Sequence, residues 1–153
     1  MEYIGGPKSD DCIFCTLPRE NEDLKNKILF RGPTCFVILN IYPYSNGHLM
    51  VAPYRHLPCL TRLSAEELQE SHRLTQLCVE ILREEYNPDG LNLGYNIGKA
   101  AGAGFDEHLH AHIVPRWMGD TNFMPVLSEV KVHPEHLLAT FERLRPRFEN
   151  RTL

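Results

Sequence analysis

The segment from His108 to Val114 places the strongest limits on what this chain can fold into. It reads His-Leu-His-Ala-His-Ile-Val, so that each histidine is followed by an apolar residue. Successive side chains of a β-strand point to opposite faces, so a strand over residues 108–115 puts three imidazoles on one face and apolar residues on the other. One face of this strand suits a buried core, and the other carries groups that ionise near neutral pH.

The spacing of the three histidines indicates that they do separate work. A strand rises about 3.3 Å per residue, so His108 and His112 lie roughly 13 Å apart along it and do not easily converge on one ion. A neutral imidazole, whose ordinary pKa is about 6.5, can attack phosphorus while charged neighbours stabilise the non-bridging oxygens. Three alternating histidines on an apolar strand are hard to explain by packing alone, and we interpret them as a functional row.

The rest of the pattern predicts an α+β domain. Apolar or alternating runs predict strands over 35–41, 48–53, 91–97 and 108–115, joined in part by short turns. Ser64 and Glu67 form a capping box that opens a long helix, followed at helical spacing by Leu74, Leu77, Cys78, Ile81 and Leu82. A closing helix is predicted over 134–148, with Pro134 near its first turn. We expect an antiparallel sheet with helices packed on one side.

Length and composition limit the class of protein. The 153 residues fit one domain, 1–153, with residues 1–11 as a flexible lead-in. A net charge of −4 argues against a long nucleic acid as partner but is compatible with a small nucleotide. No apolar run approaches the roughly 20 residues that span a bilayer, and the start lacks a signal-peptide pattern. Five cysteines suit reduced thiols, so we expect a cytoplasmic protein without membrane partners.

Two of the cysteines have the spacing of half a metal site. Cys12 and Cys15 form a Cys-x-x-Cys pair, which in a tetrahedral zinc site supplies two of four ligands. The pair alone does not establish zinc, because two reduced, buried cysteines fit the same spacing. A thioredoxin-like redox role is disfavoured, because no βαβ pattern surrounds the pair.

The histidine row resembles the signature of the histidine-triad family of nucleotide hydrolases and transferases. The resemblance extends over most of the chain: it includes Asn40, eight residues before His48, and Asn96-Ile97-Gly98 ahead of the Gly-rich loop. The segment PRWMGDTNFMPV, residues 115–126, is similar to the branch that includes diadenosine tetraphosphate phosphorylases, the ATP adenylyltransferase group. The resemblance implies a sheet of about five strands with one long and one C-terminal helix, and a homodimer formed by sheet extension and helix packing.

The resemblance also implies a role for each matching residue. His110 matches the nucleophile that attacks the α-phosphorus, and His112 contacts the phosphoryl oxygens and the scissile bridge while His48 supports the site. Asn40 would bind the ribose, and Asn96 the phosphates. Many members carry Ser, Thr or Gln just before the triad, whereas this chain has GAGFDE at 102–107. The phosphates would therefore meet backbone amides of Gly102, Ala103 and Gly104. Trp117 is close enough in sequence to reach the substrate or a subunit contact.

In zinc-containing members of the family, two histidines complete the metal site. The matching residues are His56 and His108, which with Cys12 and Cys15 would make a Cys2His2 site. Four protein ligands leave no open position for substrate, so this zinc would be structural.

The favoured function is a diadenosine tetraphosphate phosphorylase that works through a nucleotidyl-His110 intermediate. A hydrolase of nucleoside phosphoramidates or dinucleoside polyphosphates is an alternative, with water in place of phosphate as acceptor. A nucleotide-binding module without catalysis and a metalloenzyme with zinc at the histidine row are further rivals. The spacing of the row disfavours the metalloenzyme.

Overall fold

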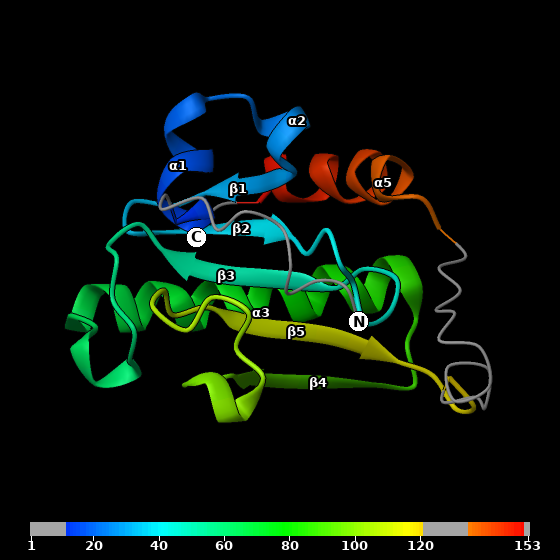
Figure 1. Ribbon diagram of the computed structural model, residues 1–153. Helices are drawn as coiled ribbons and strands as arrows, with labels where there is room; N and C mark the ends of the chain where they lie inside the picture. Colours follow the sequence, from blue (N-terminus) through cyan, green and yellow to red (C-terminus); the bar gives the residue numbers. More distant parts are fainter. Residues whose placement is uncertain (1–11, 121–134, 152–153) are drawn as a thin grey trace.

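The structure is a computed structural model that describes residues 12–120 and 135–151. Its centre is an antiparallel sheet of five strands in the order β1-β2-β3-β5-β4 (Figure 1). The strands are β1 (Ile28–Arg31), β2 (Cys35–Leu39), β3 (Leu49–Pro53), β4 (Gly90–Tyr95) and β5 (Ala111–Arg116). The helices are α1 (Ile13–Glu20), α2 (Asp23–Asn26), α3 (Ala65–Tyr86) and α5 (Leu137–Glu149), with short 3-10 turns at Leu60–Arg62 and Lys99–Ala101. The expected α+β architecture is confirmed.

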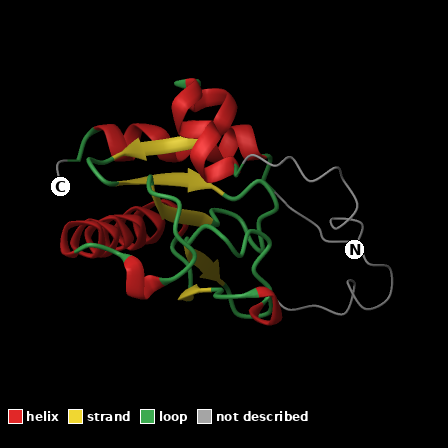
Figure 2. Ribbon diagram, turned by 60° about the vertical axis from the view of Figure 1, so that its left-hand side comes forward, coloured by secondary structure: helices red, strands yellow, loops and turns green. Residues whose placement is uncertain are grey.

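Each face of the sheet has its own apolar cluster. On one face, α3 and α5 cover the strands (Figure 2). The apolar cluster beneath these helices includes Val51, Ala111 and Ile113 of the strands. On the other face, Phe14 of α1 packs against Phe36 and Met50 and their neighbours. The helices on the first face bury the apolar side of β5, so the histidines lie on the same face as α1.

The capping box that opens α3 is present as predicted. The Glu67 backbone N–H donates to Ser64 Oγ at 3.2 Å, and the Ser64 N–H donates to Glu67 Oε2 at 2.8 Å. The five residues placed at helical spacing are all buried. The helix ends at Tyr86 and is followed by Asn87, whose left-handed backbone has a φ of 43°.

Two helices and a strand between residues 13 and 31 carry no clear sequence pattern. The helices have eight and four residues, and the residues that follow them, Asn21 and Lys27, both have a positive φ. Helices this short show little periodicity, and neither ends at the glycine that usually marks a helix terminus. Tertiary contacts hold them instead: the Arg31 guanidinium donates to the Pro18 carbonyl at 2.9 Å and pairs with the Asp23 carboxylate at 2.7 Å.

Strand β5 begins at Ala111, three residues later than the predicted start at His108. Its pairing with β3 stops at Val51 and Ala111. Two residues further along this register Leu109 would face Pro53, which has no N–H to donate. The Leu109 N–H instead donates to the Leu57 carbonyl at 2.7 Å. The predicted start of the closing helix was also early, since α5 begins at Leu137, and Pro134 lies outside the described residues. The expected flexibility of residues 1–11 concerns residues outside the described part as well.

Within the described residues, no helix is both long enough and apolar enough to cross a lipid bilayer.

Candidate functional site

The three histidines of the row reach different surroundings. His108 and His110 are buried, with 1% and 6% of their surface exposed, and His112 is half-buried. The His110 and His112 rings meet edge to face with centroids 4.8 Å apart, whereas His108 lies beside His56, at 5.2 Å. The three histidines therefore lie in different surroundings, and their separate employment stays a prediction.

A chain of hydrogen bonds assigns the tautomers of His48 and His112. The Tyr44 backbone N–H donates to His48 Nδ1 at 3.1 Å, so the proton of a neutral His48 sits on Nε2. That nitrogen lies 2.9 Å from His112 Nδ1 and donates to it. A neutral His112 then carries its own proton on Nε2. The arrangement leaves His112 as a hydrogen-bond donor at its outer nitrogen.

His110 has the opposite polarity at its outer nitrogen. Its Nδ1 lies 2.8 Å from the backbone carbonyl of His108, to which it can only donate. The lone pair of a neutral His110 is therefore on Nε2. Burial lowers the pKa of His110 below its ordinary value and favours this neutral form. An imidazole whose lone pair is on Nε2 thus stands next to one whose proton is on Nε2.

A pocket of about 690 Å³ opens beside His112. Asn92 and Gly94 of β4 line this pocket, because they pair with Val114 and His112 of β5 and so lie on the same face of the sheet as His112. Asn96 and Trp117 also line the pocket, and the Trp117 ring stands edge-on to Tyr86 with centroids 6.5 Å apart. Two predicted substrate residues are therefore brought into one cavity with a histidine of the row.

Other predicted substrate residues have local partners. Asn40 Oδ1 accepts from the Tyr42 N–H at 2.9 Å, and Asn40 Nδ2 lies 3.4 Å from His48 Nδ1. Gly102 has a φ of 81°, and its N–H donates to the Lys99 carbonyl at 3.0 Å. That amide is thus engaged in the turn, and the predicted contact of residues 102–104 with phosphate stays a prediction.

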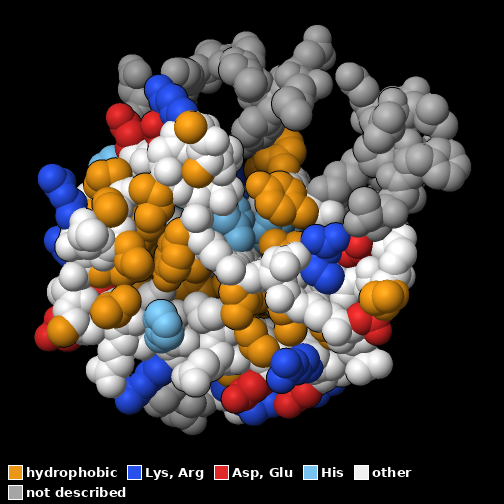
Figure 3. Space-filling model, turned by 90° about the horizontal axis from the view of Figure 1, so that it is seen from below, with side chains coloured by type: hydrophobic (Ala, Val, Ile, Leu, Met, Phe, Trp, Pro, Cys, Tyr) orange, Lys and Arg blue, Asp and Glu red, His pale blue; other side chains and the backbone are white. Residues whose placement is uncertain are grey.

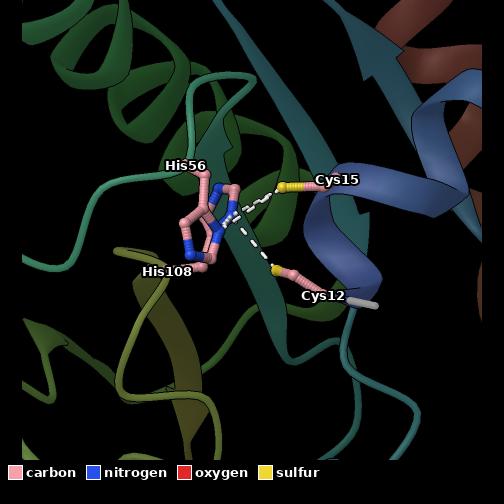
Figure 4. A group of neighbouring side chains, drawn as sticks. All are labelled: Cys12, Cys15, His56 and His108. Carbon is pink, nitrogen blue, oxygen red and sulfur yellow. Dashed lines mark hydrogen bonds between the residues drawn. The ribbon is translucent and has the colours of Figure 1, made fainter. Parts of the chain in front are cut away.

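Cys12, Cys15, His56 and His108 form a compact group whose side chains point toward one another (Figure 4). His108 Nδ1 lies 3.3 Å from Cys12 Sγ, 3.5 Å from Cys15 Sγ and 3.3 Å from His56 Nδ1. A tetrahedral ion held at about 2.3 Å by sulfur and about 2.0 Å by nitrogen separates its ligand atoms by roughly 3.3–3.8 Å. The other nitrogen of His108, Nε2, donates to the Pro53 carbonyl at 2.9 Å, which directs Nδ1 into the group. These residues fit a metal ion.

Sequence reasoning missed two aromatic residues at the site. Tyr44 lines the pocket and packs against His48 and His112, with centroids 4.7 Å and 5.9 Å away. Phe14 stacks on His110 at 4.6 Å. Tyr44 follows the turn residue Pro43, and Phe14 lies between two cysteines. The spacing of these residues in the sequence does not predict either contact.

Comparison with known proteins agrees with this geometry. The family model described as the HIT domain matches residues 21–118. The chain belongs to the HIT, or histidine-triad, family. It is 39% identical over 127 residues to an AP-4-A phosphorylase of Mycobacterium tuberculosis, a match that covers 83% of this chain and 65% of that protein. The chain thus spans slightly less than two thirds of that relative.

The similarity to two further relatives extends over most of the length of each of them. A bis(5'-adenosyl)-triphosphatase of Dictyostelium discoideum is 30% identical over 131 residues, which are 82% of this chain and 87% of that protein. A Zn-bound histidine triad family protein from Mycobacterium smegmatis is 26% identical, with a TM-score of 0.72 over 91% of this chain and 94% of that one.

The burial of His112 predicts how stability depends on pH. Burial, with a smaller effect of His110, lowers the pKa of His112 from 6.5 to about 4. Between these values the unfolded chain binds a proton that the folded chain does not, so the free energy of unfolding falls as the pH falls through this window. In urea titrations at several pH values, His112→Gln should lose less stability across the window than the unaltered protein.

His72→Gln provides the control, because it makes the same substitution at an exposed position of α3. If the free energy of unfolding changed equally with pH in His112→Gln and in the unaltered protein, burial of His112 would not be the cause of the pH dependence.

Proposed function

We propose that this HIT protein is a nucleotidyltransferase or hydrolase that acts at the α-phosphate of dinucleoside polyphosphates through His110. The observation that carries the proposal is the pair of complementary imidazoles, with a lone pair on His110 Nε2 and a proton on His112 Nε2. A nucleophile and a donor side by side are what phosphoryl substitution requires. The names of the M. tuberculosis and D. discoideum relatives support this substrate class.

In the proposed reaction, His110 Nε2 attacks the α-phosphorus and the bond from that phosphorus to the bridging oxygen breaks. With diadenosine tetraphosphate, an adenylyl group stays on His110 and ATP leaves. The proton on His112 Nε2 lies where it can meet a phosphoryl or bridging oxygen, and the proton on His48 Nε2 holds His112 in that tautomer. Asn96, Trp117, Ala103 and Gly104 would contact the substrate beside the row, and Asn40 the ribose.

The acceptor in the second step decides the products. Inorganic phosphate would attack the adenylyl group and release ADP, so that the sum is ADP plus ATP. Water would release AMP, so that the sum is AMP plus ATP. We favour the phosphorylase because the greater sequence identity is to the AP-4-A phosphorylase.

Product analysis with diadenosine tetraphosphate tests the proposal. ADP plus ATP formed only with phosphate identifies a phosphorylase, and AMP plus ATP without phosphate identifies a hydrolase. His110→Ala should lower turnover by roughly a thousandfold or more, because it removes the nucleophile. An adenylyl group should appear by mass spectrometry on the peptide that contains residue 110 of the unaltered protein.

His72→Ala, at an exposed position of α3, should keep full turnover. Comparable turnover in His110→Ala would rule out the mechanism, and tight nucleotide binding without turnover would favour a binding module.

We further propose that Cys12, Cys15, His56 and His108 hold a structural zinc ion. The donor set and its distances fit tetrahedral coordination, and a Zn-bound relative shares the fold. When bound, the ion would link α1 to the histidine row. Because four protein groups would fill its coordination, the residues of the cluster take no chemical part in the transfer.

Metal analysis of the purified protein should find about one zinc ion per chain. Cys15→Ser should lose most of the metal and lower the melting temperature, because a ligand of the cluster is removed. Cys59→Ser serves as the control, since Cys59 is outside the cluster and should leave the metal content unchanged. A full complement of metal in Cys15→Ser would contradict the ligand set.

We also propose a homodimer that pairs through β4. Among the described residues this strand forms one edge of the sheet. Leu93 within the strand is 53% exposed, and Ile97 just after it is 46% exposed. Hydrophobic side chains gather over this side of the molecule (Figure 3). An unpaired strand edge with apolar neighbours is usually covered, and a second copy would cover it symmetrically. A cytoplasmic location and the absence of long nucleic-acid partners stay predictions.

Analytical ultracentrifugation should find a dimer that Leu93→Glu dissociates, because a carboxylate would be buried at the interface. The matched control is Leu24→Glu, at a 57% exposed leucine of α2 beside the opposite edge strand. A monomer at all concentrations, or a dimer that survives Leu93→Glu, would exclude this interface.

A further inference from the structure

Phe14 lies between Cys12 and Cys15 and connects their turn to the histidine row. Its side chain is 1% exposed, and its ring stacks on His110 with centroids 4.6 Å apart and planes 25° from parallel. The same ring is 5.2 Å from His108. A nearly parallel contact of this kind restricts how the smaller ring can turn.

Three contacts fix the plane of the His110 ring. Phe14 covers one side, His112 meets it edge to face at 4.8 Å, and the Nδ1–H bonds the His108 carbonyl at 2.8 Å. Together they set the direction of Nε2. Without the Phe14 contact, the ring could turn about its last side-chain torsion, which has a broad energy profile in histidine. Two of the three contacts are tied to the Cys–His cluster of Cys12, Cys15, His56 and His108. Phe14 lies between the two cysteines, and the carbonyl that accepts from His110 belongs to His108.

The turn that carries Phe14 has little support of its own. Helix α1 has eight residues, and no side-chain hydrogen bond caps its start at Cys12. Within the first turn, Thr16 Oγ1 donates to the Cys12 carbonyl at 3.2 Å. Side chains from outside the helix bind further along, where Asn26 and Arg31 donate to the Leu17 and Pro18 carbonyls at 3.1 Å and 2.9 Å. A helix this short is not stable by itself, so its first turn depends on tertiary contacts and on whatever the two cysteines bind.

We propose that Phe14 is a positioning residue for His110, and that it makes the direction of Nε2 depend on whether the cluster holds its metal. The inference rests on the proposed function for its activity measurement. With metal bound, the Cys12–Cys15 turn holds Phe14 flat against His110. Without metal, the turn loosens and the His110 ring loses its stacking contact with Phe14.

The chain offers a matched control for the test. Phe36 belongs to the same apolar cluster as Phe14, is 0% exposed, and stacks on Tyr54 at 5.2 Å with planes 25° apart. Phe14→Leu and Phe36→Leu therefore remove the same atoms from the same core. Only the first removes a ring from His110, so a difference between the variants reports positioning and not core stability.

In Phe14→Leu, kcat should fall about ten- to a hundredfold with little change in KM, because a small misplacement of a reacting atom costs this much. Phe36→Leu should keep kcat. Chelation should lower kcat of the unaltered protein by a similar factor but add little to the loss in Phe14→Leu. Zinc content should be unchanged in both variants. If Phe14→Leu does not fold, Phe14→Met, which better keeps the volume, carries the same expectations.

A second measurement does not need turnover. In a protein labelled with nitrogen-15 at histidine, the ring signals of His110 should shift and broaden in Phe14→Leu and after chelation, but not in Phe36→Leu. Unchanged His110 signals, or equal losses of kcat in both variants, would overturn the inference. If no nucleotide is turned over by any form, the proposed function fails, and the ring signals still decide the role of Phe14.

Discussion

Ala111 and Ile113 hold β5 against the core under α3, and their position decides where the histidines point. Both side chains belong to the cluster that α3 and α5 cover, and the pairing of β5 with β3 and β4 fixes them there. A slip of one residue would drive imidazoles into that core and expose the apolar side chains instead. The direction of the row is thus set by packing on the opposite face of the sheet, which needs no contact with a substrate.

Burial of the imidazoles then decides their chemistry. A buried imidazolium would lose its hydration, so the surroundings of His110 and His112 lower their pKa values and favour neutral rings. Neutral rings have one donor and one acceptor each, and the backbone decides which nitrogen is which. The His108 carbonyl accepts a hydrogen bond from Nδ1 of His110. The Tyr44 N–H donates to Nδ1 of His48, whose Nε2 then donates to His112, so the Tyr44 N–H determines the tautomer of His112 through two hydrogen bonds. Backbone geometry therefore places a lone pair on Nε2 of His110 and a proton on Nε2 of His112.

Much of this could be predicted from local signals in the sequence. The capping box of Ser64, the apolar stripe of α3 and the alternation of the histidine strand each act within a few residues. The Cys–His cluster joins residues up to 96 positions apart, so spacing suggested only Cys12 and Cys15, and the family resemblance supplied His56 and His108. The predicted start of β5 was wrong because pairing depends on a residue of another strand, Pro53, which has no N–H to donate. Phe14 and Tyr44 were missed for the same physical reason, since their contacts exist only once distant elements are packed.

His108 connects the two halves of the site through different parts of one residue. Its Nδ1 faces the cysteines and His56, its Nε2 donates to the Pro53 carbonyl of β3, and its own carbonyl accepts from His110. A zinc ion at the cluster would hold the side chain, and through it the backbone that orients the proposed nucleophile. In the proposed reaction, such an ion would therefore affect the transfer even with all four of its coordination positions filled by protein. The same arrangement explains why the first histidine of the row can differ in function from the other two although all three lie on the same face.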